Sequence, residues 1–435
     1  MNVYMVSLGC AKNQVDSEMI LGAMKDSITL VESPIDANLI LINTCAFIEP
    51  ARKEAIDTIL QMADYKKNGA KLVVLGCLPQ RYKDEIIKLL PEVDRFITID
   101  EYRNIAKIIE GVMKGDYKIQ GEYSPLNRIY STPSYMRYIK ISEGCQNNCA
   151  FCAIPLIRGT LRSRPMESII EEVKNEVASG VYEINLISQD TTKYGYDLYD
   201  KKLMIVPLLE ELCKIDGDFK IRLLYLYPDI VTDELIEFIK THDKVMPYFD
   251  IPIQHSEEHI LKKMVRRGMK DYLLNLFKKI KTEIPNAILR TTLIVGFPYE
   301  EEEDIDHLIE FMNEVKFDRL GAFTFSLEEG TAAEKYPNVI PFDVKQKRYE
   351  RVMEAQSKIA LEKNKAMIGK VIEDAFIIGY DEESFMYVAR SYQYAPDEVD
   401  GAIFVAAHYE LSLGQRVKVK IMDCDEYTLT GEQCE

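Results

Sequence analysis

The feature that most restricts the fold of this chain is a series of six apolar runs between about residues 135 and 340, separated by segments with helical periodicity. The runs are Arg137–Ile141, Glu183–Ser188, Ile221–Tyr227, Phe249–Ile253, Ile288–Val295 and Leu320–Ser326. Short strands that alternate with helices pair in parallel, because each helix returns the chain to the same edge of the sheet. The series therefore predicts a partial (βα)6 barrel. A charged amphipathic helix from Asp343 to about Met367 is expected to pack on it.

The segments on either side of this series have different patterns. From 1 to about 120, three apolar runs each precede an amphipathic stretch, which is typical of a doubly wound parallel α/β domain. These runs are Val3–Leu8, Leu39–Asn43 and Leu72–Leu75. A polar connection over 121–127 ends this pattern. From about 368, short alternating runs predict a small antiparallel β-barrel. We expect three domains, at 1–120, 135–365 and 368–435.

The cysteine content favours metal ligation over disulfides. The 435 residues include nine cysteines at irregular spacing, and the amino terminus carries no basic export signal. A reducing compartment does not support a disulfide framework, so ligation or catalysis is the better expectation. No apolar run approaches the ~18–20 residues of a membrane span. We therefore expect a cytoplasmic protein with no membrane partner.

The formal net charge of −17 limits the choice of partner. Affinity for polyanions comes from Lys and Arg that neutralise phosphates, and here acidic residues are in excess. A basic or neutral protein fits this charge better than a nucleic acid.

Three cysteines lie on one loop directly after the first barrel strand, as Cys145-Gln-Asn-Asn-Cys149-Ala-Phe-Cys152. Three thiolates so close together can hold three irons of a 4Fe–4S cluster, which leaves the fourth iron open for another ligand. The alternatives are a zinc site or three buried thiols. Zinc usually takes four ligands, and buried structural cysteines rarely crowd one loop. The pattern therefore favours an iron–sulfur cluster.

Three further cysteines each stand within a residue or two of the end of an apolar run in the N-terminal segment. They are Cys10, Cys45 and Cys77. The carboxyl ends of parallel strands share one edge of the sheet, so these thiols are expected to meet there. Each one singly is a plausible buried small hydrophobe. Together they predict a second 4Fe–4S cluster, again with three ligands and an open iron.

The loop motif resembles the radical S-adenosylmethionine superfamily, in which the open iron chelates S-adenosylmethionine and an electron cleaves it to a 5′-deoxyadenosyl radical. The dispersed cysteines, the barrel and the C-terminal β-domain together resemble the methylthiotransferase family over essentially the whole chain. Three stretches are similar to its RimO branch, which modifies ribosomal protein S-twelve. They are Arg222–Pro228, Asp250–Ser256 and Ser326–Thr331.

This resemblance implies insertion of a methylthio group at the β-carbon of an aspartate of ribosomal protein S-twelve, free or within the small subunit. It also implies an electron donor such as flavodoxin or ferredoxin, and a sulfur source. One alternative is the transfer-RNA adenosine methylthiotransferase branch, MiaB. A second alternative, from another class, is an iron–sulfur electron carrier or scaffold, although electron transfer needs no barrel cavity.

Polar residues at the carboxyl ends of barrel strands are expected to face the active site. The candidate contacts to S-adenosylmethionine at these ends are Ser188, Gln189, Gln254 and Gly296. By resemblance, Glu183 stands near the place of the superfamily's Gly-Gly-Glu motif, although the two glycines are absent. Phe151 is suited either to pack beside the cofactor or to a plain core position.

Two charged segments have competing interpretations. The basic stretch Arg158–Arg164 either neutralises the cofactor or cluster or is a solvated face. The C-terminal domain resembles a TRAM domain, but its acidic residues outnumber its bases and suit a basic protein substrate, unless they merely solvate the surface. These acidic residues are Glu373, Asp374, Asp381, Glu382, Glu383, Asp397, Glu398 and Asp400.

Overall fold

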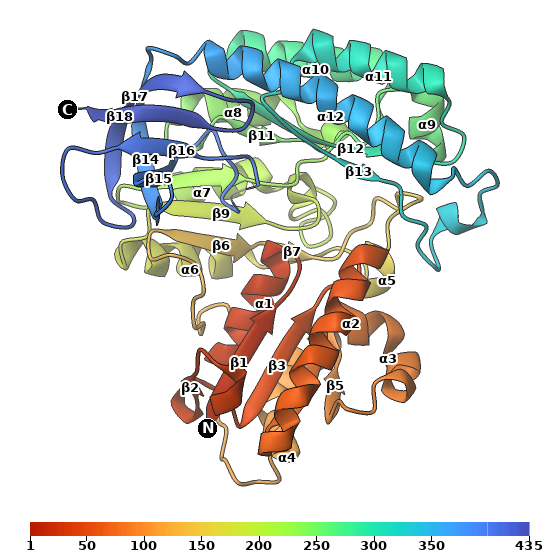
Figure 1. Ribbon diagram of the computed structural model, residues 1–435, viewed down its shortest axis with the longest axis vertical. Coiled ribbons are helices and arrows are strands. Elements are labelled where there is room, and N and C mark those ends of the chain that lie inside the picture. Colours follow the sequence, from red (N-terminus) through yellow and green to blue (C-terminus); the bar gives the residue numbers. More distant parts are fainter. Residues whose placement is uncertain (398, 435) are drawn as a thin grey trace.

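The computed structural model describes residues 1–397 and 399–434, apart from the side chains of residues 67, 68, 83 and 84. Glu398, one of the acidic residues named above, and Glu435, the last residue of the predicted third domain, lie outside this description. Figure 1 shows an N-terminal part below, a central barrel above it and a smaller β-barrel at the upper left. No helix in the described ranges has both the length and the apolarity needed to cross a membrane.

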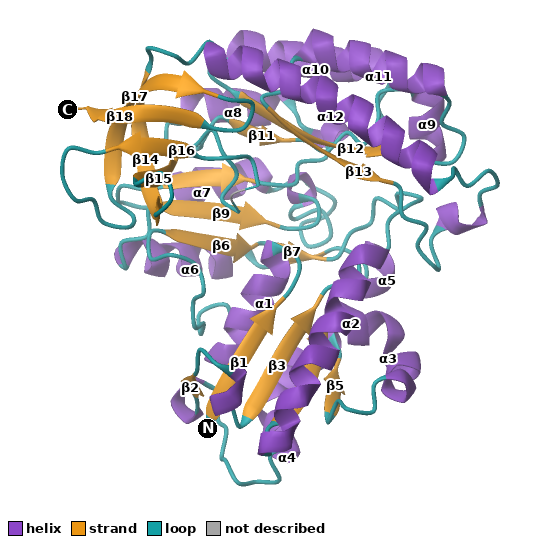
Figure 2. Ribbon diagram, in the orientation of Figure 1, coloured by secondary structure: helices purple, strands orange, loops and turns teal. Residues whose placement is uncertain are grey.

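The N-terminal part is a parallel sheet in the order β2–β1–β3–β4–β5, with helices on both faces (Figure 2). Its elements are β1 (Asn2–Ser7), α1 (Ala11–Gly22), β2 (Thr29–Leu30), β3 (Leu39–Thr44), α2 (Glu49–Ala63), β4 (Lys71–Gly76), α3 (Cys77–Leu89), β5 (Arg95–Ile97) and α4 (Ile105–Val112). Ile40 and Ile42 pack into one core, and Leu39 and Leu41 into another on the opposite face. This alternation confirms the doubly wound fold. The short strands β2 and β5 were not predicted.

The central part confirms the six predicted barrel strands. They are β6 (Met136–Lys140), β9 (Glu183–Ile187), β10 (Lys220–Leu223), β11 (Tyr248–Asp250), β12 (Ile288–Val295) and β13 (Arg319–Thr324). They pair in parallel as β6–β9–β10 and β11–β12–β13, and a bridge from Ile221 to Val245 connects the two sheets. A short hairpin, β7 (Ser142–Glu143) and β8 (Arg162–Ser163), flanks the Cys145 loop. The result is an open parallel barrel.

Helices cover the outside of this barrel (Figure 2). They are α6 (Met166–Ala178), α7 (Ile205–Cys213), α8 (Asp233–Thr241), α9 (Glu258–Lys263), α10 (Lys270–Glu283), α11 (Glu302–Val315) and α12 (Phe342–Lys365). Their apolar faces and the strand side chains that point toward them form one continuous core. The short α5 (Ile154–Arg158) packs instead against the core of the N-terminal part. The long α12 confirms the amphipathic helix expected from Asp343 onward.

The C-terminal part is a closed barrel in the order β14–β15–β16–β18–β17. Its strands are β14 (Val371–Asp381), β15 (Met386–Arg390), β16 (Ile403–Ala406), β17 (Arg416–Cys424) and β18 (Leu429–Cys434). Neighbouring strands are antiparallel, except that β16 and β18 are parallel. The sequence of β18 contains little apolar character, so it lacks the alternating pattern that predicts a strand.

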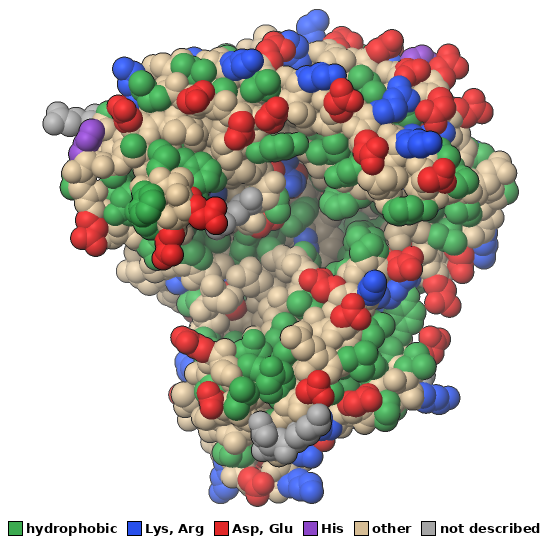
Figure 3. Space-filling view, viewed as in Figure 1, with side chains coloured by type: hydrophobic (Ala, Val, Ile, Leu, Met, Phe, Trp, Pro, Cys, Tyr) green, Lys and Arg blue, Asp and Glu red, His purple; other side chains and the backbone are tan. Residues whose placement is uncertain are grey.

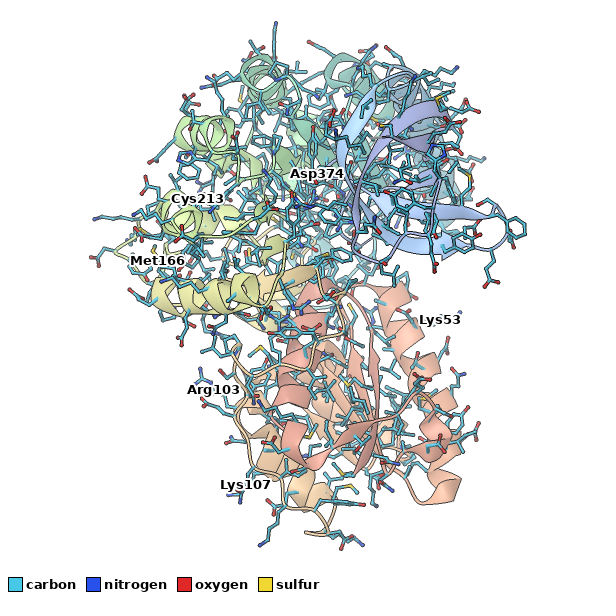
Figure 4. All side chains as sticks on the ribbon, turned by 90° about the vertical axis from the view of Figure 1, so that its left-hand side faces the viewer. Lys53, Arg103, Lys107, Met166, Cys213 and Asp374 are labelled. Carbon is cyan, nitrogen blue, oxygen red and sulfur yellow. The ribbon has the colours of Figure 1, made fainter. Side chains whose placement is uncertain are left out.

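Some acidic residues of this barrel do not form a free surface. Asp374 accepts a hydrogen bond from Tyr182 Oη (2.5 Å) and lies where the C-terminal barrel meets the central part (Figure 4). Asp400 accepts from Tyr248 Oη (2.8 Å) and from Arg290 Nε (3.1 Å). These carboxylates attach the C-terminal barrel to the central one. The exposed acidic surface is therefore smaller than the sequence suggested.

Candidate active site

The first cysteine triad lies at the carboxyl edge of the N-terminal sheet, where Cys10 follows β1, Cys45 follows β3 and Cys77 begins α3. Two neighbouring pairs of parallel strands bring these positions together. Asn13 donates to the Thr44 carbonyl (3.1 Å), and its Oδ1 lies 3.6 Å from Cys77 Sγ. The structure thus brings the three predicted thiols to one place.

Gly9 is required by the close approach of the first two cysteine segments. Its φ of +90° is in the left-handed region, and a Cβ added there would lie 2.8 Å from Cys45 Cβ. Only glycine combines this conformation with this spacing at low cost. The Gly-Cys pair after β1 is therefore part of how Cys10 reaches the triad.

The second cysteine triad lies on the loop between β7 and α5. Backbone hydrogen bonds hold this loop: Cys145 N donates to Gly159 O (3.1 Å) and Cys152 N to Cys149 O (3.0 Å). Ala150 connects it to the barrel, because its N–H donates to Met264 O and its carbonyl accepts from Ala333 N. The three thiols are therefore fixed at the mouth of the barrel.

Burial disfavours free thiolates at both triads. It raises the pKa of Cys45 and of Cys152 to about 12, and the pKa of Cys145 to about 11. The pKa of Cys77 is also raised by burial. Thiolates in such surroundings need a cationic partner, and iron or another metal supplies one. The donor set fits a metal cluster better than it fits free nucleophiles.

A buried arginine from the barrel contacts the first triad. Arg158, the last residue of α5, donates from Nη2 to Cys77 Sγ (3.4 Å) and from Nη1 to Asp16 (2.7 Å) in α1. Desolvation by the surrounding protein opposes ionisation of Cys10 even though the residue is partly open to solvent, but the charges of Lys12 and Arg158 outweigh it and lower the pKa of this thiol. The first residue of the predicted basic stretch is therefore not a solvated side chain.

An arginine and a tyrosine contact the second triad. Arg266 Nη1 lies 3.6 Å from Cys149 Sγ, and its guanidinium lies 4.4 Å from the centre of the Tyr227 ring. The hydroxyl of Tyr227 lies 3.8 Å from the same sulfur. Sequence reasoning assigned neither residue to the site. The only available signal was that Tyr227 stands at the end of a barrel strand, within one of the RimO-like stretches.

The predicted cofactor contacts at strand ends lie at the mouth of the barrel. Gln189 donates from Nε2 to Glu143 (2.9 Å), while its buried Oε1 has no hydrogen-bond partner among the described residues. Gln254 has a φ of +72°, a strained conformation of the kind found at binding sites. Ser188 follows β9 directly, and the N–H of Gly296 donates to a buried glutamate after β12.

Phe151 packs among apolar side chains, in agreement with a core position. The exposed part of its ring can still contact a ligand. The ring is partly exposed and stands edge-on to Phe297, with 6.5 Å between centroids. It belongs to a small apolar cluster beside the cysteine loop.

Glu183 is the one predicted contact that the structure removes from this site. It is the first residue of β9, whereas the cysteines lie beyond the other ends of the strands. Its buried carboxylate accepts from Arg222 Nε (2.9 Å) and from Arg390 Nη2 (2.6 Å). A carboxylate that already has two arginines is not available to a cofactor amino group. Glu183 joins the barrel to the C-terminal domain instead.

Replacing Arg390 with methionine is expected to lower the free energy of unfolding by about 3–5 kcal/mol, because Glu183 loses one of its two buried partners. Burial raises the pKa of Glu183, but Arg390 and Arg222 outweigh it and lower the pKa to about 2 from its usual 4.5. The stabilisation is thus complete above pH 4.5 and lost as the pH falls towards 2. Urea denaturation at pH 7 and pH 3.5 measures both effects.

The control for this prediction is Lys358→Met, which removes an exposed ion pair on α12 and is expected to change stability little. The pairing of Glu183 with Arg390 would be contradicted if Arg390→Met lost no more free energy of unfolding than the control. A loss that is larger at pH 3.5 than at pH 7 would also contradict it.

A hollow separates the N-terminal part from the two upper parts (Figure 3). Of the six cysteines, Cys10 is exposed, Cys45, Cys145, Cys149 and Cys152 are partly exposed, and Cys77 is buried. Lys12 and Arg158 connect the two sides, because Lys12 Nζ donates to Ser188 O (3.3 Å) and Arg158 reaches Cys77. The first triad therefore lies at the contact between the N-terminal part and the barrel.

Comparison with known families gives matches to three segments of the chain. Residues 2–98 match the family described as "Uncharacterized protein family UPF0004", residues 139–312 the radical SAM superfamily and residues 368–434 the TRAM domain. Among solved structures, the radical S-adenosylmethionine methyltransferase TsrM from Kitasatospora setae matches with a TM-score of 0.56 and 12% identity, over 74% of each chain. The S-adenosylmethionine radical enzyme OxsB matches with a TM-score of 0.51 and 12% identity, over 82% of this chain and 57% of its own. Fold and cysteine loop thus define a radical S-adenosylmethionine enzyme.

Relatives of known name show which family of radical S-adenosylmethionine enzymes the chain resembles. The ribosomal protein uS12 methylthiotransferase RimO of Clostridium botulinum strain Okra is 45% identical over 99% of this chain and 97% of its own. The RimO proteins of Caldicellulosiruptor saccharolyticus and Clostridioides difficile are 46% and 45% identical, over at least 98% of each chain. The chain therefore belongs to the RimO family of radical SAM methylthiotransferases.

Proposed function

We propose that this enzyme inserts a methylthio group at the β-carbon of an aspartate of ribosomal protein uS12, the S-twelve protein of the small subunit. The observation that carries the proposal is full-length similarity to RimO proteins in a chain with one cysteine triad at the edge of the N-terminal sheet and another on the first barrel loop. Similarity of this extent favours the ribosomal-protein branch over the transfer-RNA branch. A six-stranded barrel behind the cysteine loop, which electron transfer does not require, also disfavours a simple electron carrier.

We also propose that Cys10, Cys45 and Cys77 hold one 4Fe–4S cluster, and that the triad of the barrel loop holds a second. Three thiolates for each cluster leave one iron of each open. The cations beside the sulfurs support this assignment, since Arg158 at the first triad and Arg266 at the second offset the negative charge of a thiolate-bound cluster.

The second site and the adjacent strand ends are proposed to bind S-adenosylmethionine. The contacting residues are Phe151, Ser188, Gln189, Gln254 and Gly296. When bound, the reduced cluster supplies the electron that cleaves S-adenosylmethionine. The unpartnered Oε1 of Gln189 supports this proposal, because a buried acceptor of this kind is completed by a bound donor.

The remaining partners follow from this reaction. The enzyme is proposed to take electrons from a carrier such as flavodoxin or ferredoxin, to use a separate sulfur source and to work in the cytoplasm, where ribosomal proteins are found. The proposed domain limits stay at 1–120, 135–365 and 368–435. Exposed acidic residues of the third domain are proposed to contact the basic ribosomal substrate.

A buried glutamate fixes the position of the first triad relative to the barrel. Glu328, after β13, pairs with Arg52 of α2 and with Arg81 of α3 (2.8 Å). Arg81 also donates to the carbonyl of Ala46, which follows Cys45. The RimO-like stretch that contains Glu328 therefore docks the N-terminal domain onto the barrel.

Glu328→Gln is accordingly expected to lower methylthio transfer about 10- to 100-fold, since small displacements of reacting groups cost this much. Cleavage of S-adenosylmethionine without substrate is expected to stay near wild type. The matched control is Glu329→Gln, which alters the exposed neighbouring side chain. Equal transfer rates in both variants would show that this docking does not position the first triad.

The experiment that tests the proposed function is anaerobic turnover of the reconstituted enzyme with reductant, S-adenosylmethionine and sulfide. A peptide from the aspartate-containing loop of uS12 and a transfer-RNA anticodon stem-loop are supplied in parallel, and products are read by mass spectrometry. A methylthio gain on the peptide aspartate is expected. Gain on the RNA alone would overturn the proposal.

A further inference from the structure

Lys12 carries an ammonium group from the N-terminal domain into the mouth of the barrel. The residue stands in the first turn of α1, two positions after Cys10, and only 7% of it is exposed. Its Nζ donates to the carbonyl of Ser188 at the end of β9 (3.3 Å) and lies 3.5 Å from the centre of the Tyr225 ring beyond β10. The charge therefore stands where the first triad meets the barrel.

Other buried cations at this boundary have carboxylate partners. Arg158 and Lys140 share Asp16 and Glu143, and Arg128 pairs with two further glutamates. Lys12, in contrast, forms no ion pair with any carboxylate of the described side chains.

The two carboxylates whose charges act on Lys12, Glu143 and Asp250, are already paired. Glu143 contacts Lys140 and Arg158, and Asp250 pairs with Arg290 (3.0 Å). An ammonium that is buried without a counter-charge costs several kcal/mol. A carbonyl and an aromatic face offset only part of this cost and leave other N–H donors of the ammonium unused. The Cys10 sulfur also interacts with this ammonium, but it is assigned to the first cluster, so no carboxylate of the described side chains completes the site.

We propose that Lys12 binds the side-chain carboxylate of the aspartate that the enzyme modifies. This inference rests on the proposed function. The carboxylate carbon is bonded directly to the β-carbon, so an ammonium that holds the carboxylate also fixes the reacting carbon between the two triads. Lys12 would thus bind and orient the substrate and select aspartate over uncharged residues.

The competing explanation is that Lys12 only offsets the charge of a cluster at Cys10. The two explanations differ in their dependence on the substrate. A carboxylate contact matters for a peptide that carries aspartate and not for one that carries asparagine at the same position. An effect through the cluster would change the binding or turnover of both peptides equally, or neither.

The test measures dissociation constants of the uS12 loop peptide in aspartate and asparagine forms, for the wild-type enzyme and for Lys12→Met, with both clusters reconstituted. The wild type is expected to prefer aspartate by about 10- to 100-fold, as for a charge-assisted contact. Lys12→Met is expected to lose this preference and to bind the asparagine form within about threefold of wild type. Lys12→Arg is expected to retain part of the preference.

Lys53→Met is the control for the change in net charge, because Lys53 is exposed on the outer side of α2 (Figure 4). Equal affinity of the wild type for both peptides would overturn the proposal even if Lys12→Met could not be purified. A preference unchanged in Lys12→Met would do the same. Methylthio transfer by the wild type to the aspartate peptide separates this failure from failure of the proposed function.

Discussion

Cys149→Ala is expected to reduce cleavage of S-adenosylmethionine to less than about one per cent of the wild-type rate. The substitution removes the central thiolate of the barrel loop, which Arg266 and Tyr227 contact. Without it the proposed cluster keeps two ligands from the loop and cannot present an ordered open iron. The assay is anaerobic formation of deoxyadenosine and methionine with a chemical reductant.

Cys213→Ala provides the matched control, because Cys213 ends α7 and packs against the outer core of the barrel, away from both triads. It is expected to cleave S-adenosylmethionine at the wild-type rate. Cleavage by Cys149→Ala at a similar rate would refute the role of the second triad.

Cys45→Ala is expected to separate cleavage of S-adenosylmethionine from transfer of the methylthio group. We expect deoxyadenosine formation to continue while methylthio product on the uS12 peptide falls below about one per cent of wild type. Cys45 belongs to the triad at the edge of the N-terminal sheet, and the barrel loop holds its own three thiols independently. Both products are measured in the same reaction by chromatography and mass spectrometry.

The control for this variant is Cys424→Ala, at the end of β17 in the C-terminal barrel, which is expected to retain both products. Normal methylthio product from Cys45→Ala would contradict a sulfur-transferring role for the first triad. Loss of both products would show that the two triads do not act as separable sites.

The sequence predicted the features that depend on local patterns. Six apolar runs were enough to locate the barrel strands, and the Cys145 loop was recognisable because its ligands lie within eight residues. Cys10, Cys45 and Cys77 could be placed together because parallel strands share their carboxyl edge. By contrast, β18 packs through Leu429, Gly431 and Gln433, a pattern too polar to read as a strand.

Contacts between residues that are far apart in the sequence could not be predicted. Glu183 looked like a cofactor contact until its partner Arg390, which is 207 residues away in the sequence, was located. The contacts of Lys12 with Ser188 and of Arg266 with Cys149 span 176 and 117 residues. The local sequence pattern does not predict such contacts, because they form only when whole domains or distant segments pack against each other.

The most direct test of the central claim is the iron content and Mössbauer spectrum of the anaerobically reconstituted chain, together with two variants in which one triad is replaced by alanine. We predict about eight irons in the wild type and about four in each variant, all in 4Fe–4S clusters. A wild type with about four irons, or a variant that keeps eight, would contradict the assignment of one cluster to each triad.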